Sequence, residues 1–259
     1  MNIPTKIALA ILLAMPVTVL PVAQAQKSPP NRPRVLTPLP ATDTARVVDL
    51  FGKTAKKAPG ASDYTPLAAS PVLTPQTMLR TGEDSAMLLL LPEGHYLRLG
   101  EKTVVVLNQL GKGKSFSVKV LSGQVWAGVR NRTTKFEVRT PSCVTTAKSA
   151  LFGVGYDLET NQSMVSTGDG SVTVSLSSGG WRGTVPAGQY VRYLRNPEPN
   201  IRLRAPEVLA QDEAQKAMWQ VLRSENWTKH SPPGDNGVKL KRGQEKQLRQ
   251  LTFSVSVDE

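Results

Sequence analysis

The side chains that could do chemistry in this chain are few and lie far apart in the sequence. Cys143 is the only cysteine, and neither His95 nor His230 shares a motif with it. A thiol nucleophile needs an activating base within reach, and a zinc site needs several nitrogen or sulfur ligands at short spacing. The sequence therefore predicts no catalytic residue, no metal site and no cofactor, and we expect the protein not to be an enzyme.

The carboxylates and the glycine-rich segments also lack a reactive pattern. Spacing alone gives no acid–base pair among the hairpin carboxylates. Gly111-Lys112-Gly113-Lys114 lacks the helix and the Gly-Lys-Ser/Thr ending of a phosphate-binding loop. Gly168-Asp169-Gly170 lacks the further acidic positions of a calcium loop. Both segments are typical of turns. The carboxylates considered are Glu137, Asp157, Glu159 and Asp169.

Aromatic and arginine side chains between residues 126 and 192 suggest one binding hypothesis. Aromatic rings stack on sugar rings, and arginines pair with phosphate or carboxylate groups, so these residues would form a binding surface if they shared an exposed face. The alternative, which we rank first, is that the aromatic residues fill the core and the arginines are solvated. The candidate binding residues are Trp126, Arg130, Arg132, Trp181, Arg182, Tyr190 and Arg192.

The elements that must position these residues are short strands. Between Ser115 and Asp157, apolar and polar residues alternate, which indicates strands with one buried face. Many short strands separated by turn residues predict a mainly β fold of stacked antiparallel sheets, a β-sandwich with solenoid-like coiling. The expected strands lie near 85–91, 95–99, 102–108, 115–121, 124–129, 134–139, 142–147, 151–158, 163–167, 171–176, 181–184 and 189–194.

Two apolar runs and two helical patterns add detail. Residues 87–91 and 104–107 are continuously apolar, which predicts strands covered on both faces.

Apolar residues cluster in 45–58, where we expect a short helix. A longer helix is predicted from Pro206 to about Trp227, packed back onto the β domain, because proline suits a first helical position and an apolar stripe follows. That stripe consists of Ala210, Ala214, Ala217, Met218, Val221 and Leu222.

The first residues are typical of a secretory signal peptide. Lys6 precedes an apolar run over 7–20, and Ala23-Gln24-Ala25 has the small-x-small pattern of a cleavage site. Pro16 interrupts the short run, so an uncleaved membrane anchor ranks second. We therefore expect a periplasmic or extracellular protein with no stable membrane span after cleavage.

Composition divides the chain into four expected parts. They are a signal peptide (1–25), a proline-rich linker or arm (26–76), a β domain (77–195), and a C-terminal part (196–259) with the helix, a basic tail and a terminal strand. The alternating residues 251–257 would form that strand, paired within the chain or offered to a partner, and we favour the first.

The charge balance favours anionic partners. Lys and Arg number 32 against 20 for Asp and Glu, a formal net charge of +12, but no single run concentrates it. A basic surface attracts phosphate-bearing polymers, acidic glycans, lipid headgroups or nucleic acid. We expect an anionic polymer or a protein as the partner, and no specific nucleic acid.

Several segments between Thr77 and Arg195 resemble the FecR-type extracytoplasmic domain. Lys148-Ser149-Ala150 departs from the family pattern, which has Arg-Gly-Thr there, so a tight glycine turn is not expected. The matching segments are TGEDSA at 81–86, LPEGHYLRLG at 91–100, LSGQV at 121–125, FEVRTPS at 136–142, STGDGSVTV at 166–174 and VPAGQ at 185–189.

The resemblance implies an exported sensing or interaction module. In membrane-spanning regulators of iron uptake, such domains receive a signal from an outer-membrane transporter and pass it to a cytoplasmic sigma factor. The apolar run starts at Ile7, so we expect this chain to lack the cytoplasmic segment of those regulators. We predict a non-catalytic β domain that binds a protein or anionic polymer of the cell envelope. The alternatives are a component of a FecR-like transmembrane signalling system acting through a separate partner and, ranked last, an envelope hydrolase or transferase.

Overall fold

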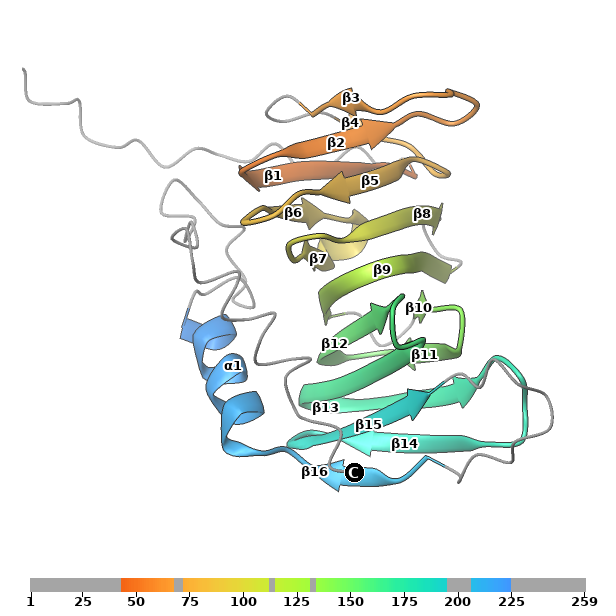
Figure 1. The fold of residues 1–259 in the computed structure, drawn as a ribbon, viewed down its shortest axis with the longest axis vertical. Helices are drawn as coiled ribbons and strands as arrows, with labels where there is room; N and C mark the ends of the chain where they lie inside the picture. Colours follow the sequence, from red (N-terminus) through yellow and green to blue (C-terminus); the bar gives the residue numbers. More distant parts are fainter. Residues whose placement is uncertain (1–42, 68–71, 112–114, 131–133, 195–205, 225–259) are drawn as a thin grey trace, which may run out of the picture. The chain divides into compact units, whose positions relative to one another are not determined.

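The structure is a computed structural model that describes residues 43–67, 72–111, 115–130, 134–194 and 206–224. These residues form 16 strands, one short 3-10 turn (η1, Pro92–Gly94) and one helix near the C-terminus (α1, Glu213–Ser224), so the mainly β prediction is confirmed (Figure 1). The predicted signal peptide, Arg132, the basic tail and the terminal strand at 251–257 lie outside the described residues.

The strands form two ladders, here called sheet A and sheet B. Sheet A takes the end of β9 and the beginning of β13, and all of its pairs are antiparallel. Its order is β4 (Val72–Leu73), β1 (Ala45–Phe51), β6 (Ala86–Leu90), β7 (Tyr96–Leu99), β9 (Ser115–Val129), β12 (Ala150–Asp157), β13 (Gln162–Leu176), β15 (Gln189–Leu194) and β16 (Val208–Ala210).

Sheet B takes the beginning of β9 and the end of β13. Its pairs are antiparallel except β9 with β10, which run parallel. This parallel pair departs from the purely antiparallel sheets expected from the sequence. The order is β3 (Thr65–Pro66), β2 (Thr54–Lys57), β5 (Met78–Thr81), β8 (Val104–Leu110), β9, β10 (Lys135–Arg139), β11 (Cys143–Ala147), β13 and β14 (Arg182–Pro186).

The long strands β9 and β13 join the two sheets. The sequence predicts a break at Gly123 and another near Gly168, but each strand continues through its glycine and passes from one sheet to the other. Gly123 has a φ of 79°, a backbone conformation that is unfavourable for residues other than glycine. The predicted turns are therefore bends that let one strand serve both sheets.

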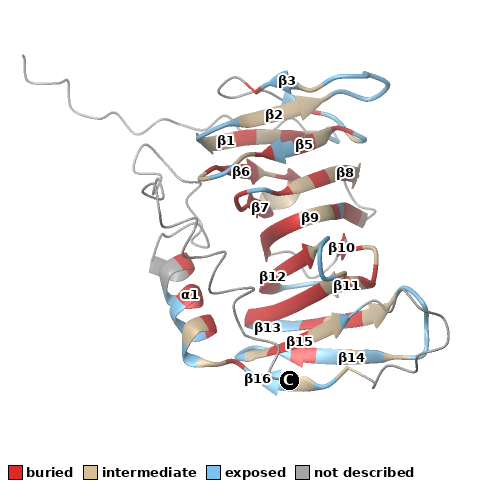
Figure 2. Cartoon of the chain, viewed as in Figure 1, coloured by how far each residue is buried: buried red, intermediate tan, exposed pale blue. Residues whose placement is uncertain are grey.

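The main core lies between the sheets. Phe116, Val118 and Val120, expected on one face of a strand, are fully buried, and so are Phe136 and Val138. Because these residues alternate with outward-facing ones, the period of two in the sequence is confirmed. Figure 2 shows that burial is densest in the central strands, whereas β3, β14 and β16 at the sheet ends carry more exposed residues.

Helix α1 covers the outer face of sheet A, where Leu88, Trp126 and Leu151 form a second apolar cluster with Met218 and Leu222 of the helix. This cover explains why the run at 87–91 is buried on both faces, as predicted. The run at 104–107 belongs to sheet B, whose outer face has no such cover from the residues that the structure describes. Alternate residues there are only partly buried, so the prediction of two covered faces is wrong for β8.

Helix α1 begins later than the sequence pattern predicts. Pro206 does not open it: β16 intervenes, and Asp212 caps the helix at Glu213. The Asp212 carboxylate accepts a hydrogen bond from the Gln215 amide at 2.7 Å while the Gln215 side chain accepts one from the Asp212 amide at 3.3 Å, a capping box. Of the predicted stripe, Met218 and Leu222 are buried but Ala217 is exposed.

Trp219, which the predicted stripe leaves out, is the largest helix side chain in this interface and is 2 % exposed. Its ring lies over Gly168 of β13, where an added Cβ would come within 2.6 Å of the indole. A side chain at position 168 would therefore push the helix away. The glycine that reads as part of a turn in the sequence is instead needed for close helix–sheet contact.

The short helix expected over 45–58 is wrong: β1 and β2 occupy this segment. Strand β1 pairs with β6 in sheet A, and β2 pairs with β5 in sheet B. The apolar residues of segment 45–58 form strands because each sheet offers an edge with which this segment can pair. The described part of 26–76 thus contributes strands, while the predicted domain boundaries remain predictions.

Candidate functional site

The outer face of sheet B carries a groove of about 1350 Å³. Its floor consists of side chains that alternate with the buried ones on β10, β11 and β13, so the same period of two that builds the core also builds the floor. Four basic and two acidic side chains line it together with several hydroxyls. The polar and charged residues that line it include Arg130, Lys135, Glu137, Thr146, Lys148, Ser149, Asp169, Ser171, Thr173, Ser175 and Arg182.

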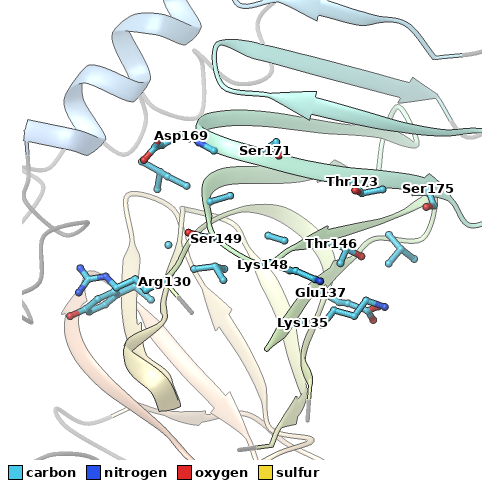
Figure 3. Close-up of a pocket in the computed structure, with 18 of the residues that line it drawn as sticks. Arg130, Lys135, Glu137, Thr146, Lys148, Ser149, Asp169, Ser171, Thr173 and Ser175 are labelled. Atoms are coloured by element: carbon cyan, nitrogen blue, oxygen red, sulfur yellow. Dashed lines mark hydrogen bonds and ion pairs between the residues drawn. The ribbon is translucent and has the colours of Figure 1, made fainter. Parts of the chain in front are cut away.

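The strand register places these side chains in rows across the sheet. Glu137 of β10 lies opposite Thr146 of β11, which lies opposite Thr173 of β13. In the next row, Ser175 of β13 lies opposite Arg182 of β14. Figure 3 shows Ser171, Thr173 and Ser175 in line along β13. The floor therefore has hydroxyls at its centre, with the apolar side chain of Val144 opposite Ser175.

Glu137 is the most buried charged group of the floor, at 7 % exposure. Lys135 and Arg139, its neighbours on the same face of β10, both form ion pairs with its carboxylate. Burial alone would raise the pKa of the Glu137 carboxyl, but the hydrogen bonds and charges of Lys135 and Arg139 outweigh burial and hold the pKa below its usual value. Glu137 therefore stays ionised, and its charge is matched by these two cations.

Lys148 and Arg182 are the groove cations without such a match. Both are exposed, and neither forms an ion pair with another of the described residues. Lys148 belongs to the bend between β11 and β12, and Arg182 begins β14. No residue of the Lys148–Ala150 bend has a positive φ, so it needs no glycine, in line with the departure from Arg-Gly-Thr. These two cations can therefore meet an anionic ligand.

At one end of the groove, the Arg130 guanidinium lies 5.0 Å from the centre of the Tyr96 ring. Burial raises the pKa of the Tyr96 phenol, and the positive charge of Arg130 lowers it by less. The Arg130 amide donates to Nδ1 of His95 at 3.3 Å. Arg130 is therefore held by the ring beneath it and by its own backbone. Figure 3 places Arg130 and Asp169 at the same end.

The candidate binding residues from the sequence do not share one surface. Arg130 and Arg182 line the groove. Trp126 is 1 % exposed beneath α1, so its ring is closed to solvent. Trp181 is half-buried against the main core. The two remaining described candidates, Tyr190 and Arg192, lie together on β15, with 5.2 Å between the guanidinium and the ring centre.

Sequence reasoning missed Lys148, Thr146 and Thr173, which are central to the groove. The sequence signal for them is the alternation of polar residues with buried valines, which predicts strands but no groove. Alternation gives the face on which a side chain lies. Alternation does not show which strands are neighbours in a sheet. Strand β11 pairs directly with β13, although β12 lies between them in the sequence.

The described residues hold no cluster of three or more His, Cys, Asp or Glu side chains that could bind a metal ion. Cys143 is buried in the core, with its Sγ 3.3 Å from Oγ1 of Thr140. Burial raises the pKa of the Cys143 thiol, and hydrogen bonds from Thr140, Ser163 and Thr145 only partly offset this. The thiolate that acts as a nucleophile is therefore disfavoured.

We expect Cys143 not to react with 5,5′-dithiobis(2-nitrobenzoic acid) in the native protein at mildly alkaline pH, and to react fully in denaturant. Absorbance of the released thionitrobenzoate measures this. The variant Ser149→Cys, in the exposed bend, provides the control and should react in the native state. If Cys143 in the native, unchanged protein reacted as fast as the new thiol of the Ser149→Cys variant, its burial would be contradicted.

Comparison with known proteins found similarity over part of the chain. Residues 77–173 match the model of the family described as FecR protein, which confirms the resemblance over less than half of the chain. The search of the curated proteins gave no significant match. Within the described ranges, no helix has both the length and the apolarity needed to cross a bilayer.

Two crystal structures, each described as that of a candidate anti-sigma factor from Parabacteroides distasonis ATCC 8503, are similar in part. The one at 1.65 Å resolution has a TM-score of 0.46 and 18% identity, over 55% of this chain and 64% of that chain. The other, at 2.50 Å, has a TM-score of 0.46 and 16% identity, over 58% of this chain and 73% of that chain. The match thus spans less than two thirds of the first of these structures.

Proposed function

We propose that this protein is an exported, non-catalytic β domain that binds a protein or an anionic polymer of the cell envelope. The observation that carries the proposal is the groove on sheet B, with its unmatched cations Lys148 and Arg182 above a floor of hydroxyls. Such an arrangement can attract and hydrogen-bond an anionic ligand, because exposed charges steer association and fixed hydroxyls orient it.

Two features of the chain support export and binding. The first residues have the pattern of a signal peptide, and residues 77–173 match a family whose domains act outside the cytoplasm. The floor strands β10, β11 and β13 are each paired on both sides, so the floor of the groove is held by the sheet, and Lys148 is added by the bend between β11 and β12. A sheet of this kind can hold ligand-binding side chains in fixed positions.

The proposal is tested by capture of envelope fractions on the purified full chain, compared with the double variant Lys148→Glu/Arg182→Glu. We expect the variant to capture about a hundredfold less of the groove ligand, because each reversal removes an attraction of about 0.7 kcal/mol and adds a repulsion of similar size. The matched control is Lys53→Glu/Lys102→Glu, which changes the net charge equally at exposed positions outside the groove. Equal losses in both double variants would contradict a role for the groove.

A component of a FecR-like signalling system, acting through a separate partner, is the second candidate. The match of residues 77–173 to the FecR family favours it. Salt distinguishes the two ligands, because screening weakens exposed charge contacts but not apolar or backbone contacts. Capture of one protein that withstands high salt would favour this candidate, whereas salt-sensitive capture of a polymer would favour the first.

A further inference from the structure

We infer that the groove on sheet B binds an acidic glycan, an extended polysaccharide that carries carboxylates, laid across the strands. The inference rests on the proposed binding function and narrows its ligand. Glu137, Thr146, Thr173 and Thr184 form one row over four neighbouring strands, and Val144, Ser175 and Arg182 lie in the next row. Hydroxyl groups in such rows can exchange hydrogen bonds with the hydroxyls of successive sugars.

The spacing of the rows fits a sugar polymer. Neighbouring strands lie about 4.8 Å apart, which is close to the repeat of a pyranose unit in an extended chain. A ligand that crosses the strands therefore meets a new floor side chain with each sugar. Arg182, at the start of β14, and Lys148, in the bend after β11, come from different elements and both line the groove, so two separate carboxylates of one chain can be neutralised.

The same geometry disfavours an acidic peptide. Peptides usually bind sheets by adding a strand to an open edge, where backbone groups are free. The groove lies on the face of the sheet, and β10, β11 and β13 already pair on both sides. The floor can therefore offer only side chains, and successive side chains on one face of an extended peptide are farther apart than the strands.

Single-stranded nucleic acid is also disfavoured. Its bases bind by stacking on exposed aromatic rings. Among the described residues of the groove lining, Tyr96 is the one aromatic, and it is 2 % exposed, with Arg130 over its ring. The floor offers hydroxyls instead, and the negative charge of Glu137 is offset by Lys135 and Arg139 so that it does not repel an anionic chain.

The test is calorimetric titration of the full chain with polygalacturonate, beside neutral dextran, poly-γ-glutamate and polyphosphate. We expect polygalacturonate to bind and dextran not to bind. Lys148→Gln/Arg182→Gln should weaken polygalacturonate binding about tenfold, and Lys53→Gln/Lys102→Gln should leave it within twofold. Circular dichroism of each variant checks that the fold is intact.

Hydroxyl removal separates a glycan site from a merely cationic one. Thr146→Val/Thr173→Val keeps the branched shape and should weaken polygalacturonate binding several-fold, whereas Thr65→Val, on the exposed strand β3 outside the groove lining, should not. Binding of polyphosphate or poly-γ-glutamate with no binding of polygalacturonate would overturn the inference and leave the proposed function standing. If no probe binds and envelope capture is also independent of the groove, the proposed function fails as well.

Discussion

Gly123→Ala is expected to destabilise the protein by about 3–5 kcal/mol, because the new methyl group meets backbone atoms at a conformation that already disfavours a Cβ. Gly123 lies at φ 79°, where β9 bends from sheet B into sheet A. An added Cβ would lie 2.4 Å from Oγ1 and 2.6 Å from Cα of Thr103, and 2.7 Å from the carbonyl oxygen of Lys102.

Thr103 cannot move aside cheaply. It is fully buried, and its Oγ1 accepts a hydrogen bond from the Gln124 amide at 2.9 Å. Its own amide donates to Oγ1 of Thr81 at 3.0 Å. A shift of Thr103 would therefore leave buried polar groups unpaired, which costs more than the contact itself. The steric clash and the hydrogen bonds both involve Thr103, so the loss of stability arises at the bend in β9.

Urea-induced unfolding, followed by circular dichroism, measures this effect. The matched control is Gly188→Ala, which has a similar φ of 78° but no atom within 4 Å of the added Cβ. It should cost only about 1 kcal/mol, the penalty of the positive φ itself. Similar unfolding midpoints for the two variants would show that the bend tolerates the methyl group, and would contradict the close approach of β9 to Thr103.

Lowering the pH from about 6.5 to about 4 is expected to destabilise the protein through His95. The imidazole is fully buried, with Phe116 and Phe136 against its ring at 4.9 and 5.7 Å between ring centres. Burial lowers the pKa of His95 from 6.5 to about 4; the Glu93 carboxylate, 3.8 Å from Nε2, raises it by less, and Arg130 lowers it further. The native state thus keeps His95 neutral.

The sign of the effect follows from proton uptake. Between pH 6.5 and 4 the unfolded chain binds a proton at His95 that the native chain does not, so stability is full above pH 6.5 and falls as the pH approaches 4. A shift of this size corresponds to a loss on the order of 3 kcal/mol at the acid end of the window. Urea unfolding at several pH values measures it.

The variant His95→Phe should remove this part of the pH dependence. Phenylalanine suits the aromatic surroundings but cannot accept the hydrogen bond from the Arg130 amide, so a constant loss of stability at all pH values is also expected. His230→Phe, at the only other histidine, serves as the control. A pH profile that is the same in His95→Phe and in the unchanged protein would disprove the assignment to His95.

The groove shows how far sequence reasoning reaches for the candidate site. The sequence predicts Arg130 and Arg182 as binding residues, and both line the groove. It also predicts Trp126, which is buried beneath α1. An exposed tryptophan and a buried one look alike in a sequence, because the helix that covers Trp126 lies about ninety residues later in the chain. Only packing decides whether such a ring meets solvent.

The errors in the predicted elements have a similar cause. The apolar residues of 45–58 are locally compatible with a short helix. The segment instead forms strands β1 and β2, because β1 pairs with β6 and β2 pairs with β5. Gly123 reads as the end of a strand, yet β9 continues through it because β7 and β12 pair with the far half. In both places, a non-local hydrogen-bond partner outweighs the local preference.

By itself, the sequence determined the mainly β fold, the inward face of each central strand and the resemblance over 77–173, because alternation and turn residues act over a few neighbouring positions. The tertiary structure decided which strands are neighbours, that β9 and β13 belong to both sheets, and that Lys148, Thr146 and Thr173 share a groove. Strand pairing joins residues far apart in the chain, and the energy that selects one pairing comes from the packed core as a whole. No short segment contains that information.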